Sequence, residues 1–129
     1  MYPTIVKTSF FDNPKEIIDF SKQINWYKPG DRDNWPGLRS DNLFNINLKL
    51  HDYIVEKIVR LYFSGHKTSI GYTKIQFHKI NYEDWLNHNR KNTRVHKDFT
   101  ELAGIIYLNQ NTNNSNTGTS LYDNDGKPI

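Results

Sequence analysis

The chain has 129 residues, of which 36% are hydrophobic and 14% aromatic, and its formal net charge is +3. This length suits one domain with a single core and is too short for two. The absence of cysteine excludes a disulfide framework and a thiolate metal site, so any bound metal must use His, Asp or Glu. Lysine and arginine are interleaved with acidic residues, which disfavours nucleic acid as a partner. No segment resembles a signal peptide or a membrane span, so we expect a cytoplasmic protein with no membrane partner.

The first part of the chain predicts a strand followed by a helix. Residues 4–11 have the composition of a strand. Residues 12–16 then supply a capping residue, a proline for the first turn and an early acidic residue, which together indicate a helix start. Apolar residues recur on one helical face as far as Ile24, and residues 26–30, which contain Pro-Gly, end the helix.

A loop and a longer helix follow. Residues 28–41 are rich in Pro, Gly, Asp and Asn and predict an irregular loop anchored by Trp35. Arg39 in this loop is a candidate to approach a substrate, because loops often carry binding residues. Apolar residues at helical spacing between positions 43 and 61 predict a helix that ends at Gly65. On its exposed face we expect an ion pair at positions 56 and 60 with no chemical role.

Beyond residue 70 the pattern becomes that of strands. Residues 72–80 alternate between apolar and polar, as a half-buried strand does. Residues 102–108 are nearly all apolar, which predicts a strand buried on both faces. Shorter strands are predicted at 93–96 and 119–122. We therefore expect one α+β domain over residues 1–129, with a helical cover in residues 1–70 and the main strands in residues 71–129.

His96 and Asp98 form the candidate metal site. Side chains two apart on a strand share a face and are separated by roughly 6–7 Å along the backbone, so an imidazole and a carboxylate can converge on one ion. Two histidines and one carboxylate form a facial set that binds Fe(II) with open positions, and zinc or manganese would also fit. A lone His-x-Asp pair is more often simply solvated. Among the other histidines, His78 is the first candidate for a further metal ligand. A single histidine on a strand is nevertheless more often a packing or surface residue than a ligand.

Two later blocks give the pair a context. Tyr107 begins a Tyr-Leu-Asn segment, and residues 118–122 read Gly-Thr-Ser-Leu-Tyr. In this order the blocks resemble the Fe(II)- and 2-oxoglutarate-dependent dioxygenases, particularly the prolyl-hydroxylase-like proteins of bacteria and phages. The resemblance implies a jelly-roll (double-stranded β-helix) core under N-terminal helices. It implies that His96 and Asp98 bind iron, that Tyr107 hydrogen-bonds the distal carboxylate of 2-oxoglutarate, and that the protein is an oxidoreductase that hydroxylates a substrate C–H bond.

The sequence departs from the family after these blocks. The family's second metal histidine and the Arg or Lys that pairs with 2-oxoglutarate lie downstream of the Gly-x-Thr block, and no histidine or arginine follows Tyr122. The interpretations are a piece of a longer protein, a remnant that no longer catalyses, or a third ligand borrowed from elsewhere. The first is favoured, because Asp125 and Gly126 form a hairpin signal that leads into a further strand. We expect little or no activity from this chain.

A second hypothesis comes from a different class of protein. Strands that lack their neighbours expose unpaired backbone, which another chain commonly covers. The chain would then be a non-catalytic jelly-roll module that forms a homodimer through its open sheet edges. Neither hypothesis identifies a substrate, and no catalytic residue is assigned beyond the groups that bind iron and cosubstrate.

Overall fold

The computed structural model of the chain describes residues 3–28, 36–63, 70–81, 83–84, 86, 100–109, 125 and 127. Within these residues the elements are, in chain order, α1 (Pro14–Ser21), β1 (Leu38–Arg39), α2 (Leu43–Ile46), α3 (Leu48–Phe63) and β2 (His78–Lys79). β1 and β2 pair antiparallel, with Leu38 opposite Lys79 and Arg39 opposite His78. The α+β class is confirmed. The described sheet has two strands, so a jelly roll stays a prediction.

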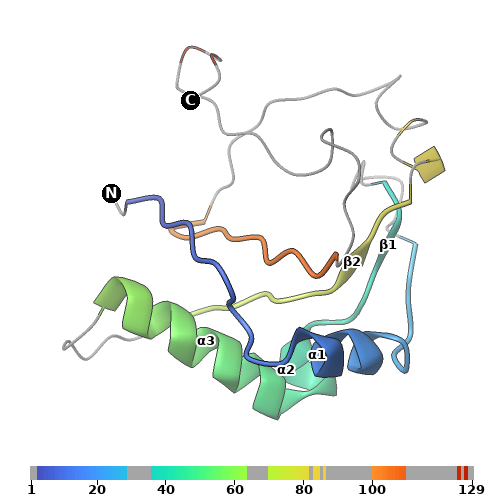
Figure 1. Ribbon diagram of the computed structural model, residues 1–129, viewed down its shortest axis with the longest axis horizontal. Helices are drawn as coiled ribbons and strands as arrows, with labels where there is room; N and C mark the ends of the chain where they lie inside the picture. Colours follow the sequence, from blue (N-terminus) through green and yellow to red (C-terminus); the bar gives the residue numbers. More distant parts are fainter. Residues whose placement is uncertain are drawn as a thin grey trace.

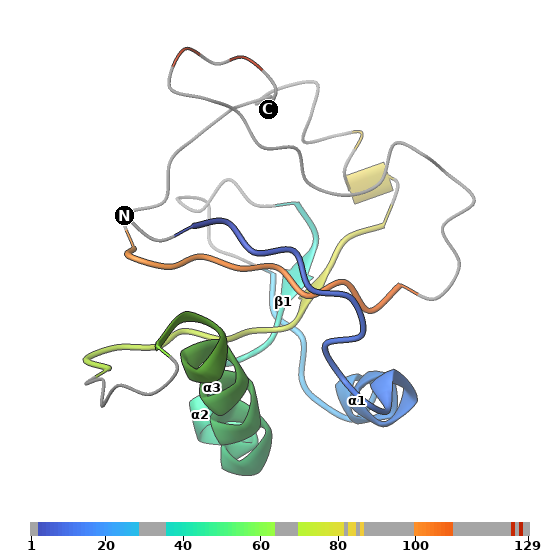
Figure 2. The same ribbon diagram turned by 60° about the vertical axis from the view of Figure 1, so that its left-hand side comes forward.

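The helices lie on one side of a layer of extended chain (Figure 1). This layer contains β1, residues 70–81, which include β2, and residues 100–109. Residues 3–11 pass this layer on their way to α1, and the view in Figure 2 confirms that α1 and α3 stay on the same side. The layer therefore has one face covered by helices, here called the helix-covered face, and an opposite face.

The core forms where the helices meet the helix-covered face. Leu43, Leu50 and Ile54 from α2 and α3 are buried together with Phe11. Partly buried apolar side chains from the helices, from the segment before α1 and from residues 70–81 and 100–109 pack around them: Phe10, Ile17, Phe20, Ile58, Ile75, Phe77, Ile106 and Leu108. Burial of apolar side chains is the main favourable term in folding, so this cluster holds the helices on the layer.

Two short polar side chains bind β1 and its continuation to the segment that leads into β2. Ser40 is 2% exposed, and its Oγ accepts a hydrogen bond from the backbone N–H of Phe77 at 2.9 Å. The Asn42 Oδ1 accepts from Ile75 N at 3.3 Å, and its Nδ2 donates to Thr73 O at 3.2 Å. These bonds satisfy backbone groups that the two-residue strands leave without a ladder partner.

Gly37 allows the same two segments to approach closely. Its φ is +84°, a region that L side chains rarely adopt, and an added Cβ would lie 2.2 Å from the carbonyl oxygen of Lys79. Glycine is required here both by the backbone conformation and by the space available.

The predicted helices are confirmed with altered boundaries. α1 begins with Asn13 as its N-cap residue and Pro14 in the first turn, as expected, but it ends at Ser21 rather than near Ile24. The second helix is divided at Asn47, whose extended backbone separates α2 from α3. The Asn47 side chain then accepts a hydrogen bond from Leu50 N at 3.0 Å and caps α3. The predicted helix end at Gly65 lies outside the described residues.

The predicted strand over residues 4–11 is wrong. The chain bends at Thr8, and Ser9 has a φ of +53°. After this bend the rings of Phe10 and Phe11 meet edge to face at a centroid distance of 5.1 Å, whereas adjacent strand residues would point to opposite faces. The Lys57 ammonium group donates a hydrogen bond to the Phe10 carbonyl and holds the bent segment on α3.

Other strand predictions are also corrected. The loop predicted over residues 28–41 contains β1. Of the strand predicted over residues 72–80, the structure forms only β2. Residues 102–108 form no strand and are not buried on both faces, because Ile105 is 60% exposed and Tyr107 is 56% exposed. The predicted strands at 93–96 and 119–122 lie outside the described residues.

Candidate functional site

The predicted iron ligands His96 and Asp98 lie outside the described residues, so their role stays a prediction. Tyr107, the predicted cosubstrate residue, is described and is more than half exposed. Among the residues that the structure describes, no three His, Asp or Glu side chains come together in a way that could hold a metal ion. The described residues that bear on function are therefore those on the face of the layer that carries Tyr107.

Tyr107 lies on the face opposite the helices. Its neighbours Ile106 and Leu108 pack against the core, whereas Ile105 and Tyr107 are exposed. Alternate residues of an extended segment point to opposite faces, so Tyr107 points away from the helices. Residues 100–109 run beside residues 70–81 in both ribbon views (Figures 1 and 2).

A row of three side chains crosses the same opposite face. The backbones of Tyr27 and Arg39 exchange hydrogen bonds of 2.7 and 2.9 Å, and Arg39 also lies opposite His78 in the β1–β2 register. Residues directly opposite each other in antiparallel pairs share a face, with Cβ atoms about 4.5–5.5 Å apart. The neighbouring residues Ser40 and Phe77 turn toward the core, so the row lies on the side away from the helices.

His78 lies in a positively charged environment. Partial desolvation of its ring, together with the positive charges of Arg39 and Lys74, lowers the pKa of His78 to about 4. The imidazole is therefore neutral at pH 7.

Arg39 is held more firmly than a typical surface arginine. Its backbone is bonded on both edges, to Tyr27 and within the β1–β2 pair, and its Nε atom is buried. A guanidinium with a packed stem loses little rotamer freedom when it binds a ligand.

A buried histidine on the helical side was missed by sequence reasoning. His51 is 6% exposed, and its Nδ1 and Nε2 lie 2.9 Å from Asp52 Oδ1 and 2.8 Å from Thr73 Oγ1. The ring also meets Phe44 edge to face at 5.3 Å. Because both ring nitrogens are satisfied and the ring is buried, His51 fastens α3 to residues 70–81. Its partner Thr73 is remote in sequence, so no local pattern signals the contact.

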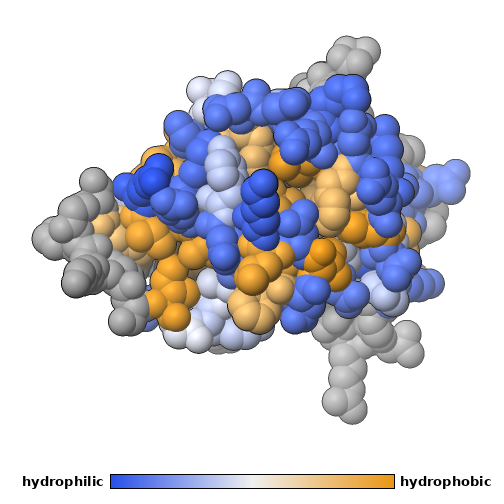
Figure 3. Space-filling view, turned by 90° about the horizontal axis from the view of Figure 1, so that it is seen from below, coloured by the Kyte–Doolittle hydropathy of each residue, from blue (hydrophilic) through white to orange (hydrophobic). Residues whose placement is uncertain are grey.

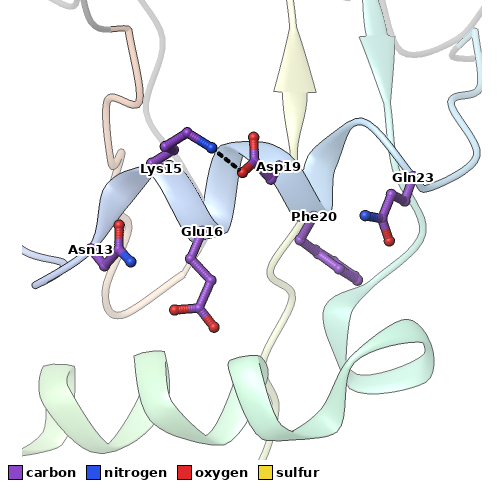
Figure 4. A pocket seen from close by; sticks show the side chains of 6 residues that line it. All are labelled: Asn13, Lys15, Glu16, Asp19, Phe20 and Gln23. Atoms are coloured by element: carbon purple, nitrogen blue, oxygen red, sulfur yellow. Dashed lines mark hydrogen bonds and ion pairs between the residues drawn. The ribbon is translucent and has the colours of Figure 1, made fainter.

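A shallow depression of about 350 Å³ lies along α1 (Figure 4). Its lining residues are Asn13, Lys15, Glu16, Asp19, Phe20 and Gln23. The ammonium group of Lys15 lies 2.6 Å from Asp19 Oδ2, and this hydrogen bond is the main cause that lowers the pKa of Asp19. Since these exposed charges neutralise each other at the surface, the depression offers no group poised for chemistry.

Comparisons with known proteins do not assign the chain to a family. No protein-family model matches the chain, and neither a curated protein nor a solved structure shows significant similarity to it. In the described part of the chain, none of the helices has the length and apolar character needed to cross a bilayer.

Proposed function

We propose that the chain is an Fe(II)- and 2-oxoglutarate-dependent oxygenase of the prolyl-hydroxylase type. His96 and Asp98 bind the iron, and Tyr107 hydrogen-bonds the cosubstrate. The proposal is carried by the order of the three sequence blocks together with the exposure of Tyr107 on the face away from the helices. Peptidyl, amino-acid and other small substrates are all compatible with it.

The arrangement of the described layer supports this proposal. In a jelly roll, two sheets pack face to face, and a ligand site can form between their inner faces. Here α1 and α3 cover one face of the extended segments (Figure 1). The other face carries the phenol of Tyr107, the guanidinium of Arg39 and the neutral imidazole of His78. Polar groups on the face without helices are what a site between two such sheets requires.

The chemistry of the donor groups fits the proposed cofactors. A histidine and a carboxylate without thiolates suit Fe(II), and the hydroxyl of a tyrosine can donate a hydrogen bond to a carboxylate oxygen. Bound iron with 2-oxoglutarate and dioxygen would supply the oxidising step. The sequence offers only two ligands in the motif, and we therefore expect weak metal binding and little or no turnover from these 129 residues.

Metal titration tests the proposal. Mn(II) binding, followed by electron paramagnetic resonance, should be weak in the parent chain and lost in Asp98→Ala. The Mn(II) affinity should fall by more than the roughly 10–100-fold that is typical when a residue that only hydrogen-bonds a metal ligand is removed. Asp12→Ala is the matched control, because this exposed carboxylate lies beside α1 and outside the motif. Its affinity should equal that of the parent.

Two results would contradict the proposal. The first is the absence of Mn(II) binding in the parent, and the second is equal binding in the parent and in Asp98→Ala. Either result, combined with a stable dimer in light scattering, would favour the non-catalytic module. Robust succinate release from the parent would contradict the expected low activity while leaving the class of enzyme intact.

A further inference from the structure

The N-terminal segment, residues 3–11, is attached to the rest of the protein mainly by its inner end. Its outer residues, 3–9, are all exposed, and Val6 is 89% exposed. The inner residue Phe11 is only 8% exposed and belongs to the core together with Leu50 and Ile54 of α3. The attachment of the whole segment therefore depends on the contacts that Phe11 and its neighbour Phe10 make with α3.

Lys57 makes several of these contacts at once. Its ammonium group donates a hydrogen bond to the Phe10 carbonyl oxygen, and it lies 5.0 Å from the centroid of the Phe10 ring and 5.1 Å from that of the Tyr53 ring. The Tyr53 ring in turn stacks on Phe11 at a centroid distance of 6.1 Å. A cation over aromatic rings is attracted by them, and its hydrogen bond to a carbonyl is stronger than one between neutral groups. The contact therefore depends on the charge of Lys57 and not only on its packing.

The backbone on either side of the two phenylalanines allows them to leave α3 together. Ser9 has a φ of +53°, which is unfavourable for a residue other than glycine and is maintained by the contacts that follow it. On the other side Asp12 is exposed, and the side chain of Asn13 makes no capping hydrogen bond to α1. Separation of the segment from Lys57 would relax Ser9 and leave α1 packed on the core.

We infer that residues 3–11 form a strap that opens from α3 while the rest of the core stays folded, and that the charge of Lys57 keeps it closed. In the open state α3 exposes Tyr53 and the apolar surface of Leu50 and Ile54 that Phe11 covers in the closed state. Local opening of this kind is characteristic of terminal segments that few contacts hold. The inference rests on these contacts alone and does not depend on the proposed oxygenase function.

Limited proteolysis with chymotrypsin, followed by mass spectrometry of the fragments, measures the opening. Cleavage after Phe11 requires an open strap because this residue is buried, whereas Tyr72 is 74% exposed and can be cleaved while the strap is closed. The initial rate of cleavage after Tyr72 is therefore an internal standard. When opening and closing are fast relative to cleavage, the initial rate after Phe11 reports the population of the open state.

Variants assign the effect to Lys57. Lys57→Met keeps a long side chain without the charge, and it should raise the ratio of cleavage after Phe11 to cleavage after Tyr72 by about 10- to 100-fold, the range for loss of a hydrogen bond from a charged group. Lys49→Met is the matched control, because Lys49 is an exposed lysine on the same helix, and its ratio should equal that of the parent. Tyr53→Leu removes one of the two rings and should raise the ratio by about 2- to 5-fold. It is the second variant if Lys57→Met does not fold.

The dependence of cleavage on urea distinguishes local opening from global unfolding. Opening of the strap exposes little surface, so the logarithm of the rate after Phe11 should rise far less steeply with urea than global unfolding does in circular dichroism. A rate after Phe11 that follows the full urea dependence of global unfolding would overturn the strap. Equal cleavage ratios in Lys57→Met and Lys49→Met would overturn the role of Lys57 in keeping it closed.

Discussion

Asn42 is the residue whose replacement best tests how the layer is held together. Its Oδ1 accepts hydrogen bonds from Phe44 N at 3.2 Å and Ile75 N at 3.3 Å, and its Nδ2 donates to Thr73 O at 3.2 Å. One side chain therefore caps α2 and also ties it to the segment that leads into β2. Asn42→Ala removes all three bonds, whereas Asn42→Ser keeps a helix-capping oxygen but is too short to bridge to residues 73–75.

The expected loss follows from the three bonds. An N-cap side chain contributes about 1 kcal/mol, and each of the two bonds to the neighbouring segment contributes about 0.5–1.5 kcal/mol. Asn42→Ala should therefore lower the free energy of unfolding by about 2–4 kcal/mol. Asn42→Ser should lose about 1 kcal/mol less than Asn42→Ala, because its hydroxyl still accepts from the first turn of α2.

Urea denaturation followed by far-UV circular dichroism measures these differences. The slope of unfolding free energy against urea concentration should be the same for all three proteins, so that the midpoints report stability directly. A loss below about 0.5 kcal/mol in Asn42→Ala would refute the bridging role, since that is the range of ordinary surface substitutions. Equal losses in both variants would show that the cap contributes nothing.

Three further predictions use the same assay. Gly37→Ala should destabilise the protein by at least about 1–3 kcal/mol, because the residue has a positive φ and its Cβ would collide with Lys79 O. Leu43→Ala should cost about 2–5 kcal/mol, since Leu43 is 2% exposed at the centre of the core; a loss under 1 kcal/mol would contradict its place there. The free energy of unfolding should fall as the pH drops from about 6.5 to about 4, because the unfolded chain then binds a proton at His78 that the folded chain does not. His78→Gln should show a smaller fall, and an unchanged one would refute the shifted pKa of His78.

Local signals in the sequence predicted the helices well. The start of α1 at Pro14 is signalled by the proline itself, whose fixed φ suits the first turn of a helix, while the side chain of the N-cap residue Asn13 makes no capping hydrogen bond. The apolar spacing of α3 also predicted its core face, and the expected exposed pair of Glu56 and Arg60 is present at 2.5 Å. The break at Asn47 was missed, because the apolar pattern continues through it and the capping bond to Leu50 depends on the exact turn.

The extended segments could not be predicted to the same degree. Ile105 is exposed although it is identical in type to the packed Ile106, so the run of apolar residues alone could not predict that exposure alternates along this segment. The burial of a strand residue depends on what covers each face, which is a property of the whole fold. The sequence did single out Arg39 and His78, but for separate reasons, because only the pairing of β1 with β2 brings these distant residues together.

Apolar surface beyond the core also depends on the fold. Seen from the helical side, apolar side chains remain visible among the hydrophilic ones (Figure 3). Phe44 and Leu48, at the junction of α2 and α3, are each more than half exposed. Ile46 and Tyr53, close to them in sequence, are also exposed, and much of the accessible surface of any folded protein is apolar.

The register of the layer couples its stability to its chemistry. Apolar residues 75 and 77 face the core while positions 74 and 78 face the other way, so a slip by one residue would exchange the two sets. Gly37, Ser40 and Asn42 prevent such a slip, because each makes a contact that exists in only one register. A variant that loosens these contacts but keeps its helices should therefore lose the close approach of Arg39 to His78 and raise the pKa of His78 toward its ordinary value, although neither residue has been changed. An unchanged pKa of His78, measured by NMR in an Asn42→Ala protein that has lost its expected stability, would show that the pairing of β1 with β2 fixes this arrangement without help from these side chains.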